Sequence, residues 1–227
     1  MSTRAFSRRQ FLARAATGAG AVAGAGTLAA GCSSSSPPGQ PHPHAVLAGA
    51  VGELGITNDH FVFFTTTQGR TVDAVAERFI PADALGPGAR EAGVVFYIDR
   101  ALAGPYVEQR EVYRAGLAAL DAYCQATHGG AFVSLSADKQ DAVLRAMEDG
   151  SATGFTAPSA KAFFETLWNH VREGMFCDPS HGGNRNFIGW RLLRHPGVQW
   201  EHPATAQATG YGVDHQMRAS GDWGFRR

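Results

Sequence analysis

Apolar residues recur over residues 65–80 at the i, i+3, i+4, i+7 and i+8 spacing that places side chains on one face of a helix. The positions of this face are Val72, Val75, Ala76, Phe79 and Ile80. Thr65 and Gln68 have the spacing of a capping box, which begins helices, and Pro81 cannot continue one. The pattern therefore predicts a helix between Thr65 and Pro81.

Four further stretches have helical periodicity and are bounded by residues that start or stop helices. They cover residues 89–102, 105–129, 136–150 and 158–176. Pro105 suits a first turn, Ser136 suits an N-cap, and Gly129 and Gly150 suit helix ends. In the last stretch an apolar face is expected in the core, with Phe163, Phe164, Leu167, Trp168 and Val171.

The chain on either side of these stretches adds little regular structure. The segment HFVFF at residues 60–64 is short, and it suits either a strand or the lead-in to the first helix. After Phe176 the periodicity disappears into Gly, Pro, His and isolated aromatic residues. We therefore expect a mainly α fold, a compact bundle of about five helices over residues 61–197 with an irregular tail at 198–227. The tail either forms a partner-binding arm or folds back on the helices.

The charge distribution argues against nucleic-acid binding. The 227 residues have a formal net charge of zero, with 20 Lys and Arg against 20 Asp and Glu. Four of the arginines lie in residues 1–31, which contain no acidic residue, so removing this segment leaves 16 basic residues against 20 acidic ones. Such a chain lacks the basic footprint of nucleic-acid binding.

The first 31 residues have the order of parts found in an export signal. The segment SRRQFL resembles the twin-arginine export motif and carries it in Arg8, Arg9, Phe11 and Leu12. The five glycines of residues 15–31 would each cost a helix about 1 kcal/mol relative to alanine, which argues against an ordinary amphipathic helix. We expect residues 1–31 to be a signal peptide, with export to the periplasm or the outer face of the cell membrane.

The three cysteines leave two questions open. The segment AAGC, which ends at Cys32, resembles a lipoprotein processing site, and residues 32–60 are typical of a flexible tether; plain signal-peptidase cleavage is the alternative. Cys124 and Cys177 suit either a disulfide in an oxidising compartment or two buried free thiols. The sequence contains no CxxC, CxxCH or Cys/His cluster, so we expect neither c-type haem nor structural zinc.

Polar residues and glycines crowd together in DPSHGGNRNFIGW, residues 178–190. Their glycine spacing matches neither GxGxxG nor GxxxxGK[ST], so no phosphate-binding loop is indicated. Asp178 and His181 have acid–base chemistry, but a catalytic pair also needs an orienting group and a pocket. We expect a structured loop that also contacts a partner, in which Asp178 and Pro179 start a turn, the glycines supply positive φ and Asn184 caps or bridges backbone groups.

Three segments together resemble one family. They are TVDAVAERFIPADALGPGAREAGVVFYIDRAL, FVSLSADKQDAVL and AFFETLWNHVREGMFCDPSHGGNRNFIGWRLLRHPG. The last contains the pattern F-x-D-P-x-x-G-G-N-x-x-x-x-G-W, formed by Phe176, Asp178, Pro179, Gly182, Gly183, Asn184, Gly189 and Trp190. From residue 63 to residue 197 the chain resembles the gluconate 2-dehydrogenase subunit 3 family, the small subunits of membrane-associated, FAD-dependent sugar and polyol dehydrogenases.

The resemblance implies a chain without catalytic residues or a cofactor of its own. In such complexes a large subunit of the glucose–methanol–choline class holds FAD, and a cytochrome c subunit often takes the electrons. The small subunit supports maturation of the large one and supplies the twin-arginine signal for both, while lipid or the complex itself provides membrane association. Two alternatives remain: a free-standing envelope lipoprotein that binds another partner or a small ligand, and an independent hydrolase or metal enzyme centred on Asp178 and His181.

Overall fold

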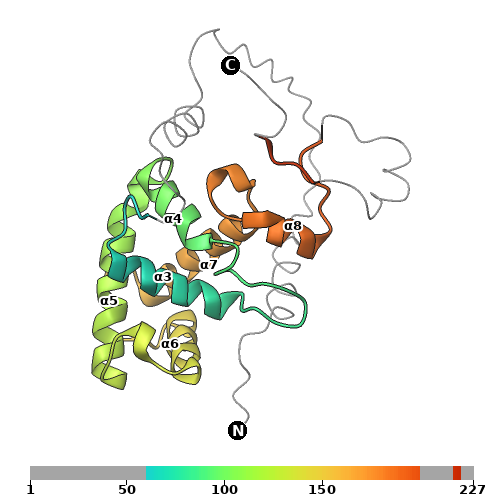
Figure 1. Ribbon diagram of the computed structural model, residues 1–227. Helices are drawn as coiled ribbons and strands as arrows, with labels where there is room; N and C mark the ends of the chain where they lie inside the picture. The colour runs from blue at the N-terminus through green and yellow to red at the C-terminus, as the bar shows by residue number, and fades with distance from the viewer. Residues whose placement is uncertain (1–59, 200–216, 221–227) are drawn as a thin grey trace, which may run out of the picture.

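The computed structural model describes residues 60–199 and 217–220 (Figure 1). Within these residues it contains six α-helices, four short 3₁₀ helices and no β-strand. The α-helices are α3 (Thr66–Phe79), α4 (Val94–Ala103), α5 (Arg110–His128), α6 (Ala137–Asp149), α7 (Ala160–Phe176) and α8 (Ile188–Leu193). The 3₁₀ helices are η1 (Val107–Gln109), η2 (Phe132–Ser134), η3 (Pro179–His181) and η4 (Arg185–Phe187). The mainly α bundle predicted from the sequence is confirmed.

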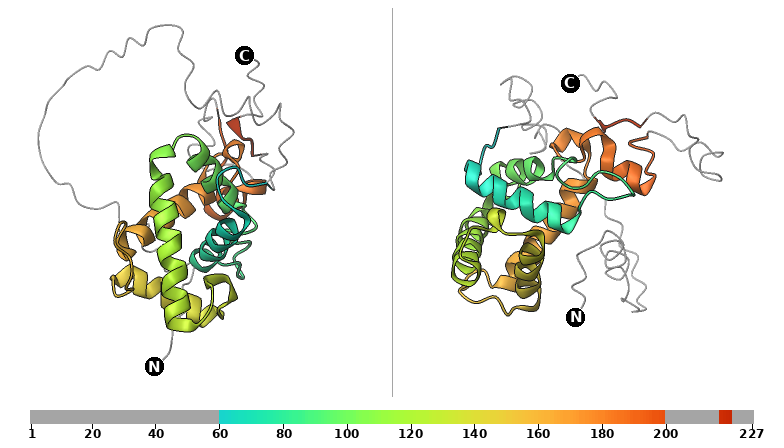
Figure 2. Two further views of the ribbon diagram at one scale, coloured as in Figure 1. Left: turned by 90° about the vertical axis from the view of Figure 1, so that its left-hand side faces the viewer. Right: turned by 60° about the horizontal axis from the view of Figure 1, so that its bottom comes forward.

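Helix α7 lies at the centre of the bundle, because it contacts α3, α4, α5, α6 and α8. The longest helix, α5, stands along one side (Figure 2, left). Phe79 of α3 packs edge-on against Phe164 and Trp168 of α7, with ring centroids 5.2 Å apart in both pairs. This confirms that Phe164 and Trp168 belong to the core.

The first helix begins as its capping box predicts. The side chain of Thr65 accepts the backbone N–H of Gln68, and the Gln68 side chain in turn accepts the backbone N–H of Thr65. These two bonds satisfy donors that the first helical turn leaves unpaired. The helix then ends at Phe79, just before Pro81.

The HFVFF segment is a lead-in to α3 and not a strand. The buried carboxylate of Asp99 in α4 accepts the backbone N–H groups of Val62, Phe63 and Phe64 at 2.6, 2.9 and 2.8 Å. In a sheet these three N–H groups would donate to a neighbouring strand. Here the single carboxylate of Asp99 accepts all three. Asp99 therefore fixes where the chain enters the bundle.

Two helix boundaries differ from the prediction, and one helix was not predicted. Helix α4 begins at Val94 instead of Ala89, because its N-cap, Gly93, takes a left-handed conformation with φ 68°. Helix α5 begins at Arg110, so Pro105 lies in the turn before η1 and not in the helix. Helix α8 was missed, since its six residues are too few to show a periodic pattern.

Candidate functional site

The loop after α7 starts at Asp178, whose carboxylate binds two backbone groups. One oxygen accepts the N–H of Ser180 at 2.9 Å, and the other accepts the N–H of Ser220 at 2.8 Å. Burial raises the pKa of Asp178, but the hydrogen bonds from Ser180 and Ser220 outweigh it and hold the pKa below its ordinary value. The carboxylate thus serves as an ionised anchor for backbone, which does not favour an acid–base pair with His181.

Asn184 joins the two ends of the loop. It is fully buried in the left-handed conformation, with φ 46° and ψ 37°. Its side-chain amide donates to the carbonyl of Cys177 at 2.8 Å, and its side-chain oxygen accepts the N–H of Gly189 at 2.8 Å. Its own N–H donates to the carbonyl of Gly174 at 2.9 Å. The predicted bridging role of Asn184 is therefore confirmed.

The three glycines of the motif serve two different purposes. Gly182 has φ 100°, as predicted for a turn glycine. Gly183 and Gly189 do not have positive φ, so that part of the prediction is wrong for them. A Cβ on Gly183 would lie 2.2 Å from the carbonyl oxygen of Gly174, and one on Gly189 would lie 1.9 Å from that of Met175. These two glycines allow the loop to lie directly on the end of α7.

Two arginines fasten the loop to α4. The guanidinium of Arg185 lies over the ring of Phe96 at 4.2 Å and beside Gly93, where a Cβ would come within 2.5 Å of it. Arg100 reaches back from α4 to the loop, and a Cβ on Gly182 would lie 2.0 Å from its guanidinium. Burial, followed by the positive charge of Arg185, lowers the pKa of Arg100. These contacts of Arg100 and Arg185 were not predicted from the sequence, although both arginines lie in the segments that carry the family resemblance.

The outer side of the loop is strained and partly apolar. Asn186 and Phe187 have φ 54° and 59°, which is rare for residues other than glycine. Phe187 is half-buried and stacks on Trp190 with ring centroids 5.6 Å apart, while the Trp190 indole N–H donates to the carbonyl of Phe176 at 2.9 Å. His181 and Asn186 of the same loop are exposed. The loop therefore presents a fixed surface made of polar and aromatic side chains.

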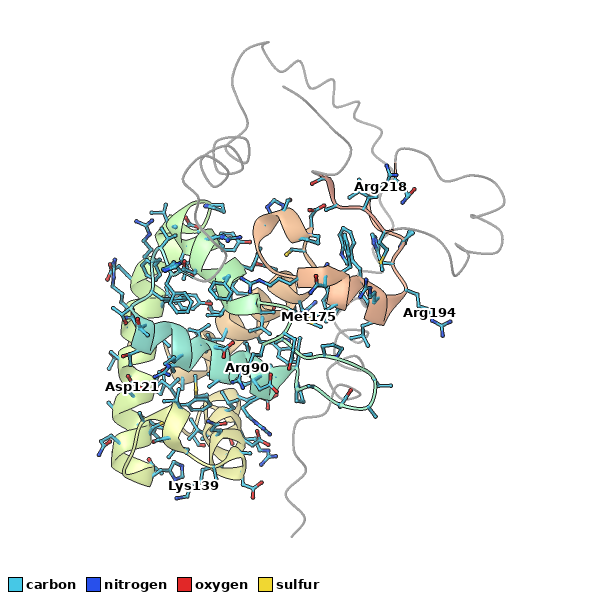
Figure 3. All side chains as sticks on the ribbon, in the orientation of Figure 1. Arg90, Asp121, Lys139, Met175, Arg194 and Arg218 are labelled. Atoms are coloured by element: carbon cyan, nitrogen blue, oxygen red, sulfur yellow. The ribbon has the colours of Figure 1, made fainter. Side chains whose placement is uncertain are left out.

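Residues 217–220 contact this loop and the segment that follows α8. Of the predicted tail, the structure describes residues 198, 199 and 217–220. The N–H of Val198 donates to the carbonyl of Arg218 at 2.9 Å, and Ser220 is held by Asp178. Figure 3 shows Arg218 on the same side of the molecule as Arg194, which follows α8. The described part of the tail thus folds back on its own chain.

Both cysteines in the described residues are free thiols. Cys124 is buried in α5, where burial and then the charge of Asp121 raise its pKa to about 11. Cys177 lies at the end of α7, and burial raises its pKa to about 12 despite opposing backbone hydrogen bonds. Of the two alternatives left open by the sequence, the structure contains the free thiols. Thiols with such high pKa values are poor nucleophiles.

Several sequence predictions fall elsewhere in the chain. The twin-arginine residues Arg8, Arg9, Phe11 and Leu12 and the lipidation candidate Cys32 lie outside the described residues. Across residues 60–199 and 217–220, no three or more His, Cys, Asp and Glu side chains gather where they could hold a metal ion. No helix in the same part of the chain combines the length and the apolar character needed to cross a membrane.

The model of the gluconate 2-dehydrogenase subunit 3 family matches residues 66–197, which is more than half of the chain. The chain belongs to this family. Its resemblance, inferred from three sequence segments, is thereby confirmed. No curated protein and no solved structure matches the chain. The match to gluconate 2-dehydrogenase subunit 3 begins with α3 and ends at Gly197, so it contains the whole Asp178–Trp190 loop and α8.

Proposed function

We propose that this chain is a non-catalytic accessory subunit of an FAD-dependent sugar or polyol dehydrogenase. It binds the large, FAD-containing subunit, supports its maturation and carries it out of the cytoplasm on the twin-arginine signal of residues 1–31. The observation that carries the proposal is membership of the gluconate 2-dehydrogenase subunit 3 family over residues 66–197. The family takes its name from a subunit of gluconate 2-dehydrogenase.

The geometry of the loop supports a binding role over a catalytic one. The side chains of Asp178 and Asn184 are engaged in holding backbone, since Asp178 binds Ser180 and Ser220 and Asn184 binds Cys177 and Gly189. A loop with fixed backbone loses little conformational entropy when a partner binds it. We therefore assign the surface of the Asp178–Trp190 loop to contact with the large subunit.

Purification of the full chain from the envelope fraction of its native host tests the assembly. We expect a much larger protein to co-purify and the complex to show the visible absorbance of oxidised flavin. Dye reduction by sugars, polyols and sugar acids then identifies the substrate. A colourless single chain would contradict the proposal and favour the envelope lipoprotein that the AAGC segment at Cys32 allows.

Paired leader variants test shared export. Replacing Arg8 and Arg9 by lysine should remove both subunits from the envelope fraction, because the twin-arginine pair is the recognised element. The matched control replaces Arg4 and Arg14, which lie in the same leader outside the pair, and should leave export unchanged. Wild-type export of the large subunit by the Arg8/Arg9 variant would show that the partner has a route of its own.

A further inference from the structure

A groove of about 520 Å³ runs beside the C-terminal half of α7. Phe176 is the one residue of the family motif that lines it. Its other lining residues are Gln109 of η1 and, from α7, Thr166, Asn169, His170, Arg172 and Glu173. None of them was predicted from the sequence to have a functional role.

A polar network joins two residues that line the groove, His170 and Glu173, to three tyrosines behind them. The hydroxyls of Tyr97 and Tyr106 both donate to one carboxylate oxygen of Glu173, each at 3.1 Å. The hydroxyl of Tyr113 lies 2.9 Å from Nδ1 of His170, and the Tyr106 ring stacks on the imidazole at 4.9 Å. This network fixes the orientation of His170, of which 8% is exposed.

The network determines which nitrogen of His170 carries the proton. Burial, and then the charge of Glu173, raise the pKa of Tyr113 well above its ordinary value, while burial lowers the pKa of His170. The phenol is therefore protonated and the imidazole neutral. Among the described residues, Nδ1 of His170 is the only hydrogen-bond partner of the buried Tyr113 hydroxyl, so the hydroxyl donates to Nδ1. The remaining proton lies on Nε2, which makes Nε2 a donor in a residue that lines the groove.

Other donors in the groove are also unused. Within the described residues, no hydrogen bond or ion pair involves the side chains of Arg172, Asn169 or Gln109. The negative charge of Glu173 would repel an anion in the groove. Two phenol hydroxyls already donate to one of its carboxylate oxygens, however, and they disperse this charge. All the N–H donors of the Arg172 guanidinium are therefore available to a ligand. A guanidinium can bind a carboxylate through two parallel hydrogen bonds.

We propose that this groove binds the carboxylate of an Asp or Glu side chain from the large subunit, paired with Arg172 and supported by the Nε2–H group of His170. This inference rests on the proposed accessory function and adds a second contact region to the loop. A protein partner fits better than a small anion, because Val107, on the same 3₁₀ turn as Gln109, is an apolar side chain left 52% exposed. Interfaces combine such apolar contacts with arginine and tyrosine.

Chemical cross-linking tests the carboxylate directly. In the Arg172→Lys variant, a zero-length carbodiimide joins the introduced amine to a carboxylate in contact with it, forming an amide with loss of water. We expect mass spectrometry of the cross-linked complex to find an Asp or Glu of the large subunit. Coupling only within this chain, or no coupling in a complex that still assembles, would overturn the proposal.

Charge reversal provides a second readout. Arg172→Glu should lower recovery of the large subunit at least about tenfold, because it sets two carboxylates against each other. Lys161→Glu reverses an exposed charge on the same helix and should change nothing, with thermal melting confirming that both variants fold. Equal recovery with Arg172→Glu and wild type would refute the groove as a binding site. If the wild type itself recovers no flavoprotein, the accessory function fails instead.

Discussion

Asp178 holds the backbone N–H of Ser220 at 2.8 Å across 42 residues of chain. A backbone hydrogen bond lies close to it in the sequence: the N–H of Val198 donates to the carbonyl of Arg218 at 2.9 Å. Gly197, with φ 84°, permits the approach, because a Cβ there would lie 2.8 Å from the backbone of Arg218. Residues 217–220 are therefore part of the loop surface, and a partner that covers the loop meets these residues as well.

Replacing Asp178 by asparagine should loosen residues 217–220 while leaving the helices folded. The substitution weakens acceptance from the Ser220 N–H, a hydrogen bond that contributes about 1 kcal/mol, so amide exchange there should be roughly fivefold faster. Hydrogen exchange read by mass spectrometry measures this. Asp83→Asn alters a similar exposed turn contact, with Leu85, and should leave residues 217–220 unchanged. Unaltered exchange in Asp178→Asn would mean that other contacts hold the tail.

The attachment should also depend on pH. The folded-state pKa of Asp178 lies below its ordinary value of 3.8. Its contribution to stability is therefore fully present above that pH and is lost as the pH falls through the folded-state pKa. The amide resonance of Ser220 should titrate with a midpoint below 3.8, and this transition should be absent from Asp178→Asn. A midpoint above the ordinary value would contradict the assigned hydrogen bonds.

Substitutions of Asn184 should separate its side-chain bonds from its backbone conformation. Alanine removes both bonds, leaves the Cys177 carbonyl and the Gly189 N–H buried without partners, and strains a left-handed residue, so the free energy of unfolding should fall by about 3 to 5 kcal/mol. Glycine loses the same bonds but accepts the conformation, and should be less destabilising than alanine by about 1 kcal/mol. Urea unfolding of the two variants gives the difference. Equal losses would show that the backbone at Asn184 is not strained.

Local patterns were enough to predict five of the six described α-helices. The capping box at Thr65 and Gln68 and the apolar face of α7 each act through residues a few positions apart, and such information lies within a short window of sequence. The same holds for the end of α6, where Gly150 has φ 81°. The sequence also predicted that Asn184 bridges backbone, because its neighbours form a recognisable turn.

The contacts that give the loop its shape could not be predicted in this way. Arg100 of α4 lies against Gly182 of the loop, and Arg185 of the loop lies over Phe96 of α4. No periodicity links positions so far apart in the sequence. The left-handed conformation of Phe187 contradicts local preference, and its ring stacks on Trp190, a contact between side chains that no local pattern predicts. The His170 network was missed for a similar reason, as its tyrosines come from α4, α5 and the turn between them.

Gly189 and Gly129 provide a matched pair for testing close approach against backbone conformation. A Cβ at Gly189 would lie 1.9 Å from the Met175 carbonyl oxygen, so Gly189→Ala must displace backbone and should cost about 3 kcal/mol or more. Gly129 has φ 73° with nothing within 4 Å of an added Cβ, so Gly129→Ala carries conformational strain alone, about 1 kcal/mol. Chemical unfolding of both variants should therefore rank Gly189→Ala as the more damaging. A smaller loss at Gly189 would mean that the loop moves off α7 at little cost, and the rigid loop surface assigned to partner binding would then have to be abandoned.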